Sequence, residues 1–112
     1  MSLRDLFHRG GSIDVAEAAR LLETGDLVLV DVRESAEWRS GRVPGAQHVP
    51  LSGLARGVDA LAREEKQVAF ICRSGHRSGA ACAAARSRGL DALNVRGGMR
   101  AWQRAGLAVT KD

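Results

Sequence analysis

The stretch that decides the fold is Phe70-Ile71-Cys72-Arg73-Ser74-Gly75-His76-Arg77-Ser78. It continues an apolar run that begins at Val68, and a short apolar run of this kind is typical of a strand buried on both faces. A brief polar loop follows, and an Ala-rich segment predicted to be a helix over 78–88 comes directly after it. A strand that passes through a short loop into a helix is typical of an α/β domain.

The polar loop places Cys72 at the expected start of a helix. Backbone N–H groups of such a loop point into one concavity, and a helix N-terminus carries roughly half a positive charge. A free thiol with a pKa near 8.5 is only about 3% thiolate at pH 7. Lowering that pKa by about 2 units, or about 2.7 kcal/mol, raises the thiolate above roughly 70%. Arg73 and Arg77 add positive charge, and Gly75 permits the positive φ of a tight turn. We therefore predict an activated thiolate at Cys72, the alternative being an inert thiol at a strand end.

Outside this stretch, helical and strand patterns alternate, which favours an α/β fold. Asp14 and Glu17 have the spacing of a capping box that opens a helix over about 15–23, and the apolar run 27–30 predicts a second buried strand that ends at Asp31. The remaining predictions are a short helix over 35–39, a turn at 43–46, an edge strand at 47–49, a weak helix over 52–64, a strand at 93–95 and a helix over 99–105.

Length and composition are those of one soluble domain: 112 residues, 45% hydrophobic and 27% charged. The net charge of +4 fits small anionic partners, or simply a basic surface. The sequence lacks the basic runs interleaved with aromatic residues that predict nucleic-acid binding. The sequence shows no signal peptide and no apolar stretch of about 20 residues, so we expect a cytoplasmic protein without membrane contact. The spacing of Cys72 and Cys82 matches no zinc pattern, so no metal site is expected.

Four motifs in order resemble the rhodanese family of single-domain thiosulfate sulfurtransferases, over about residues 13–109. They are Asp31-Val32-Arg33 with Glu37-Trp38, Gly41-Arg42-Val43-Pro44-Gly45-Ala46, the loop from Cys72 to Ser78, and Gly97-Gly98 with Trp102. The resemblance implies a three-layer fold, with a small and mainly parallel central sheet and helices on both faces. Outside the resemblance lie an N-terminal extension over 1–12 and a tail over 110–112. In the extension, Leu3, Leu6 and Phe7 have helical spacing, which predicts a short helix packed on the domain, with a self-association surface as the alternative.

The length of the loop separates two chemistries of this fold. Cys72 and Arg77 are spaced as Cys-x4-Arg, whereas the related phosphatase loops are one residue longer, and position 78, where those loops would have Arg, holds Ser. The shorter loop resembles the sulfurtransferase branch. Phosphatase or arsenate reductase activity is the runner-up enzymatic interpretation.

The resemblance implies a double displacement in which Cys72 takes a sulfane sulfur from thiosulfate or another persulfide donor and passes it to cyanide or a thiol. A protein thiol is a further possible acceptor, and no cofactor is implied. Substrate-binding roles are implied for the rest of the loop, with His76 at its rim or merely exposed; these residues are Arg73, Ser74, Gly75, His76, Arg77 and Ser78. A persulfide carrier or a redox-sensing or regulatory module would use the same Cys72, so these alternatives remain open.

Supporting roles are predicted outside the loop. Because parallel strands end at the same edge of a sheet, Asp31 is expected to brace the loop or its arginines, with Arg33 as a second loop-supporting residue and plain capping as the alternative for Asp31. We expect Glu37 and Trp38 to anchor the short helix. Two residues are assigned to the core: Trp102, and Cys82 as a small buried helix residue.

Overall fold

The computed structural model describes residues 11–111 and contains one five-stranded, entirely parallel sheet in the order β1-β5-β4-β2-β3. The strands are β1 (Ser12–Ile13), β2 (Leu27–Asp31), β3 (Gln47–His48), β4 (Gln67–Ile71) and β5 (Ala92–Val95). The α/β class and the parallel sheet predicted from the sequence are confirmed.

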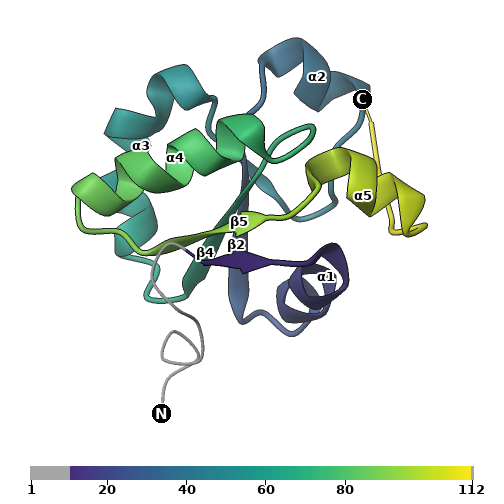
Figure 1. Ribbon diagram of the computed structural model, residues 1–112, viewed down its shortest axis with the longest axis horizontal. Coiled ribbons are helices and arrows are strands. Elements are labelled where there is room, and N and C mark those ends of the chain that lie inside the picture. The colour runs from purple at the N-terminus through teal and green to yellow at the C-terminus, as the bar shows by residue number, and fades with distance from the viewer. Residues whose placement is uncertain (1–10, 112) are drawn as a thin grey trace.

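Two helices cover each face of the sheet, which gives the predicted three layers. On one face lie α3 (Leu54–Ala62) and α4 (His76–Ser87), and on the other lie α1 (Val15–Glu23) and α5 (Gly98–Arg104), as Figure 1 shows. A short helix, α2 (Ser35–Ser40), follows β2, and a single 3-10 turn spans Leu51–Gly53. None of these helices is long and apolar enough to cross a membrane.

Alternation along the strands builds two separate cores. In β2, Val28 and Val30 pack toward α3 and α4, whereas Leu27 and Leu29 pack toward α1 and α5. Successive side chains of a strand point to opposite faces, so a strand that is apolar throughout is buried on both. All five residues of β2 and all five of β4 are buried, as the continuous apolar runs predicted.

The ends of several elements differ from the sequence predictions. Helix α4 begins at His76, two residues before the predicted start, because Gly75 adopts φ +106° and serves as its N-cap. β1 was not predicted, because two residues carry no periodic pattern. It begins at Ser12, one residue before the expected domain start, and at the other end Thr110 pairs with Arg42. The expected helix within 1–12 falls mostly outside the described residues.

Two helices begin at acidic caps. Asp14 accepts a hydrogen bond from the backbone N–H of Glu17 (2.8 Å), as predicted, but the Glu17 carboxylate pairs with Arg20. A reciprocal capping box forms instead at α2, between Glu34 and Glu37. Glu34 and Glu37 therefore stabilise the start of α2, and this helix lines the site described below.

The sheet brings the ends of β2 and β4 together. These strands pair in register, with Asp31 opposite Ile71, so Asp31 and Cys72 stand at the same carboxyl edge. Open parallel sheets bind ligands at this edge. The fold thus places the Cys72 loop where the sequence analysis expected a site.

Candidate active site

The sulfur of Cys72 lies against the N-terminus of α4. Its Sγ accepts hydrogen bonds from the backbone N–H of Gly75 (3.1 Å), from the backbone N–H of Ser78 (3.3 Å) and from the Ser78 hydroxyl (3.3 Å). The loop between β4 and α4 is therefore wound around the sulfur, as predicted from its sequence. Cys72 is almost completely buried, with 1% of the residue exposed.

These donors set the acidity of the thiol. Burial, the largest single influence, raises the pKa of Cys72. The hydrogen bonds from the Ser78 hydroxyl and from the N–H groups of Ser78, Gly75 and Ser74 outweigh burial, so the pKa of Cys72 lies below its ordinary value. Donors that point at the sulfur favour its charged form, as they do for any anion at a helix N-terminus.

Asn94 of β5 holds this arrangement in place, a role that the sequence analysis missed. Its Oδ1 accepts from the Ser78 hydroxyl (2.6 Å), and its Nδ2 donates to the backbone carbonyl of Gly75 (3.1 Å). The Ser78 hydroxyl has one proton, so it donates either to Asn94 or to the Cys72 sulfur at any moment. Ser78 therefore links the acidity of Cys72 to a side chain on the neighbouring strand.

Arg77, in the first turn of α4, is oriented by Glu37 of α2. Its Nη1 and Nη2 donate to the two carboxylate oxygens of Glu37 at 2.6 and 2.8 Å. The Arg77 guanidinium lowers the pKa of Glu37 to about 2, and Glu37 raises the pKa of Arg77 above its usual range. A Cys72 thiolate also raises the pKa of Arg77, so the guanidinium lies within electrostatic reach of the sulfur. Glu37 thus anchors both its own helix and Arg77.

Asp31 supports Arg33 and not the arginines of the loop. The carboxylate of Asp31 accepts four hydrogen bonds from Arg33. One comes from the backbone N–H (3.0 Å), two from the side-chain Nε (2.9 and 3.0 Å) and one from Nη2 (2.7 Å). Arg33 Nη2 also donates to the carbonyl of Gly41 at 2.6 Å. Asp31 is completely buried, and these bonds offset the cost of burying its charge. The sequence analysis expected Asp31 to brace the loop or its arginines, or to act as a cap. In the structure Asp31 accepts from the backbone N–H of Arg33, and the loop arginine Arg77 is paired with Glu37.

The start of α5 closes the loop from the other side. The backbone N–H of Met99 donates to the carbonyl of Cys72 (2.8 Å), and that of Arg100 donates to the carbonyl of Arg73 (3.0 Å). Gly98 makes this contact possible, because a Cβ there would lie 2.3 Å from the Cys72 carbonyl oxygen. The Gly97-Gly98 motif is therefore a close approach of two backbones beside Cys72.

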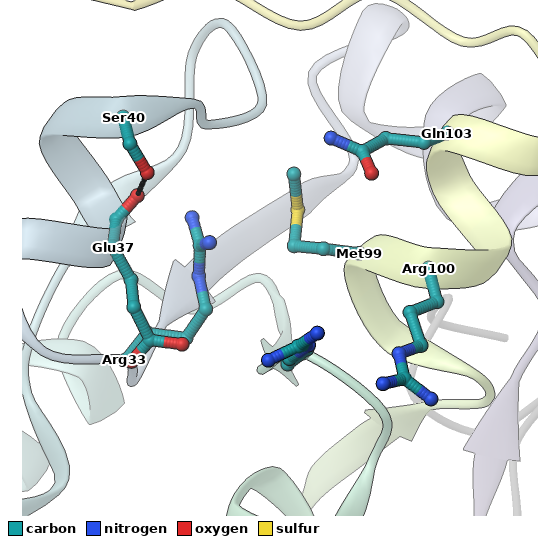
Figure 2. Close-up of a pocket in the computed structure, with 7 residues that line it drawn as sticks. Arg33, Glu37, Ser40, Met99, Arg100 and Gln103 are labelled. Atoms are coloured by element: carbon teal, nitrogen blue, oxygen red, sulfur yellow. Dashed lines mark hydrogen bonds between the residues drawn. The ribbon is translucent and has the colours of Figure 1, made fainter.

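A pocket of about 260 Å³ lies between α2 and α5, and Arg73 of the Cys72 loop forms part of its lining. In Figure 2, Arg33, Glu37 and Ser40 stand on one side of it, and Met99, Arg100 and Gln103 project from α5 on the other. Arg73 completes the lining.

The predicted substrate-binding residues of the loop differ in exposure. Arg73, Ser74 and His76 are exposed, whereas Ser78 is buried beneath the sulfur. Residues 11–111 contain no cluster of His, Cys, Asp and Glu that could hold a metal ion.

The remaining assignments concern residues away from the sulfur. Cys82 is buried in α4, and burial raises the pKa of its thiol to about 11, so the prediction of a buried helix residue agrees with the structure. Trp102 is buried in the core, where its Nε1 donates to the carbonyl of Ala108.

Trp38 stacks on His48, with ring centroids 4.7 Å apart, and the His48 ring forms a hydrogen bond with the Arg33 carbonyl. The sequence analysis gave His48 no role.

Comparison with known proteins identifies the class to which this fold and this loop belong. Residues 14–105 match the model of the rhodanese-like domain, which covers most of the chain. The chain belongs to the rhodanese-like family.

Named relatives and a solved structure agree with this assignment. Two curated proteins whose names contain the word sulfurtransferase are each 38% identical to the chain. The protein from Allochromatium vinosum aligns with 80% of this chain and 84% of its own length, and YtwF from Bacillus subtilis with 70% and 75%. The crystal structure of a rhodanese-related protein from Thermoplasma volcanium superposes with a TM-score of 0.82 at 30% identity, over 91% of this chain and 99% of that one.

Proposed function

We propose that this protein is a sulfurtransferase that carries sulfur as a persulfide on Cys72. The observation that carries the proposal is the ring of donors around the Cys72 sulfur at the N-terminus of α4. The rhodanese-like family and the relatives named as sulfurtransferases support sulfur transfer in general. Thiosulfate or another persulfide as donor, and cyanide or a thiol as acceptor, are the finer parts of the proposal.

The first half of the reaction loads the cysteine. The Cys72 thiolate attacks the outer sulfur of thiosulfate, a new S–S bond forms, and the S–S bond of thiosulfate breaks. Sulfite leaves with the electron pair of that bond. The donors that hold the thiolate then face the terminal sulfur of the persulfide, which is also an anion, so both states of the site are stabilised by the same groups.

The second half regenerates the thiolate. A nucleophile such as cyanide attacks the terminal sulfur, the S–S bond to Cys72 breaks, and its electron pair returns to the Cys72 sulfur while thiocyanate leaves. Arg77, oriented by Glu37, and the exposed Arg73 supply positive charge for the anionic donor and for the leaving sulfite. The amide groups of Ser74 and Gly75 and the buried Ser78 complete the binding loop, and His76 lies at its rim.

Intact-protein mass spectrometry after treatment with thiosulfate tests the loading step. We expect the wild-type mass to increase by one sulfur atom, Cys72→Ser to show no increase, and Cys82→Ser to load like the wild type. A wild-type protein that gains no sulfur would exclude thiosulfate as the donor. Repeated formation of thiocyanate per protein molecule distinguishes an enzyme from a carrier that is loaded once. Turnover of a phosphate monoester without thiocyanate formation would favour the phosphatase alternative.

A further inference from the structure

Two arginines beside the Cys72 loop carry charges that no side chain within residues 11–111 neutralises. Arg33 is paired with Asp31 and Arg77 with Glu37. The guanidinium groups of Arg73 and Arg100, in contrast, make no hydrogen bond or ion pair with any residue between 11 and 111. Both are exposed and both line the pocket between α2 and α5.

Arg73 and Arg100 come from different elements, but their backbones are joined. The backbone N–H of Arg100 donates to the carbonyl of Arg73, and the backbone N–H of Met99 donates to the carbonyl of Cys72. The backbone of Arg100 is therefore held beside the loop where α5 is docked on it. In Figure 2, Met99, Arg100 and Gln103 all project from α5, so the lining of the pocket combines a thioether, an amide and a positive charge.

We propose that this pocket binds the carboxylate of a small organic thiol that accepts sulfur from Cys72, and that Arg100 selects for that negative charge. The inference rests on the proposed function and names its acceptor class. A volume of about 260 Å³ is close to the lower end of small-molecule sites, so it leaves room for a carbon skeleton beyond the sulfur atoms themselves. A guanidinium recognises a carboxylate with two parallel hydrogen bonds, which a neutral thiol does not provide.

The transfer that this binding assists is balanced in atoms and charge. The thiolate of the acceptor attacks the terminal sulfur of the Cys72 persulfide, and a new S–S bond forms on the acceptor. The S–S bond to Cys72 breaks, and its electron pair restores the Cys72 thiolate. The carboxylate takes no part in the bond changes, so Arg100 acts on the position and concentration of the acceptor.

Mercaptoacetate and mercaptoethanol provide a matched pair of acceptors, because they are similar in size and differ in charge. Protein loaded with thiosulfate is mixed with each thiol, and the loss of the extra sulfur is followed by mass spectrometry. The ratio of the two rates in a variant, relative to the same ratio in the wild type, cancels the different acidities of the thiols. We expect Arg100→Gln to lower this ratio about fivefold, as for loss of one partly exposed charge pair. Arg100→Lys should restore part of it, and added salt should reduce it in the wild type.

Arg104 supplies the control, since it lies on the last turn of α5 and outside the pocket. Arg104→Gln removes the same net charge and is expected to keep the wild-type ratio. A ratio that is unchanged in Arg100→Gln, or that falls equally in Arg104→Gln, would overturn the proposal.

Alkylation of Cys72 by iodoacetate and iodoacetamide tests the pocket without sulfur transfer. We expect the rate ratio of these two reagents to fall in Arg100→Gln in the same way. If Cys72 takes up no sulfur from thiosulfate but this ratio still falls, the donor in the proposed function is wrong and the anion-selective pocket stands. If sulfur is loaded but both ratios are unaffected, the pocket proposal fails and the sulfurtransferase proposal stands.

Discussion

The sulfur of Cys72 receives its only side-chain hydrogen bond among the described residues from Ser78. Removing this donor leaves the backbone N–H groups of Gly75 and Ser78 in place. We predict that Ser78→Ala raises the pKa of Cys72 by roughly half a unit to one unit, the equivalent of one modest hydrogen bond. The pH dependence of iodoacetamide alkylation measures this pKa. Ser87→Ala, which removes a hydroxyl bonded to Ala84 at the far end of α4, is the control and should leave the profile unchanged.

Glu37 links stability to pH through its pair with Arg77. Its pKa falls from 4.5 to about 2 in the folded protein, so its contribution to stability is complete above about 4.5 and is lost as the pH falls toward about 2. We expect Glu37→Gln to reduce the free energy of unfolding near neutral pH by about 1 kcal/mol, a value reduced for the partial exposure of the pair. The difference from the wild type in urea unfolding should shrink as the pH is lowered through this window. A constant difference at all pH values would contradict this account.

The same substitution separates a positioning role from a merely structural one. Without Glu37, the Arg77 guanidinium loses the two bonds that orient it. We therefore expect the rate of Cys72 loading by thiosulfate to fall roughly tenfold in Glu37→Gln, the effect of about 1.4 kcal/mol on a barrier. Glu17→Gln, which breaks an exposed pair with Arg20 on α1, should leave the loading rate at its wild-type value.

Among the elements, α5 makes the contact that the site depends on most directly, through Gly98. This residue has φ +56°, and a Cβ would also lie 2.7 Å from the backbone carbonyl of Arg73. Gly98→Ala should cost more than about 2 kcal/mol, because it combines a left-handed backbone with a clash against another backbone. Gly106→Ala is the matched control: its φ is +74°, but a Cβ there would meet no neighbouring heavy atom within 4 Å. Urea unfolding should show only the backbone cost of about 1–2 kcal/mol for Gly106→Ala.

Displacement of α5 should also be visible in the chemistry of Cys72. Alkylation of Cys72 in folded Gly98→Ala is expected to differ from the wild type, because the loop carbonyls of Cys72 and Arg73 lose their partners on α5. In Gly106→Ala it should not differ. Equal stability and equal alkylation in the two variants would show that the close approach at Gly98 is not required.

On the scale of the whole molecule, stability comes from two cores on the opposite faces of a single sheet. Phe70 is completely buried on the α3 and α4 face, in the same core cluster as Cys72. Phe70→Ala should cost about 3–5 kcal/mol, a large share of the roughly 5–15 kcal/mol that stabilises a typical domain. Phe70→Leu keeps most of the volume and should cost less than about 1.5 kcal/mol. Denaturant unfolding measures both, and similar losses in the two variants would contradict the packing described.

Much of this molecule is predictable because it depends on local patterns. The apolar runs that end at Asp31 and at Cys72 predicted two buried parallel strands, and Gly75 marked the turn before α4. Capping at Asp14 and burial of Cys82 followed from the same short-range reasoning. The order and spacing of four motifs then identified the family, and the parallel arrangement placed Asp31 and Cys72 at one edge of the sheet.

Other features depend on which elements pack side by side, and no spacing within the sequence specifies that. Glu37 meets Arg77 across 40 residues, and Asn94 meets Ser78 across 16. Arg100 stands beside the loop because α5 docks on it through Gly98. By itself, the sequence determined that this protein has an α/β fold, and it predicted a thiolate at Cys72 in the loop before a helix. Only the tertiary structure decided which side chains orient Arg77 and hold Ser78, because these partners come from elements that meet only when the two cores form.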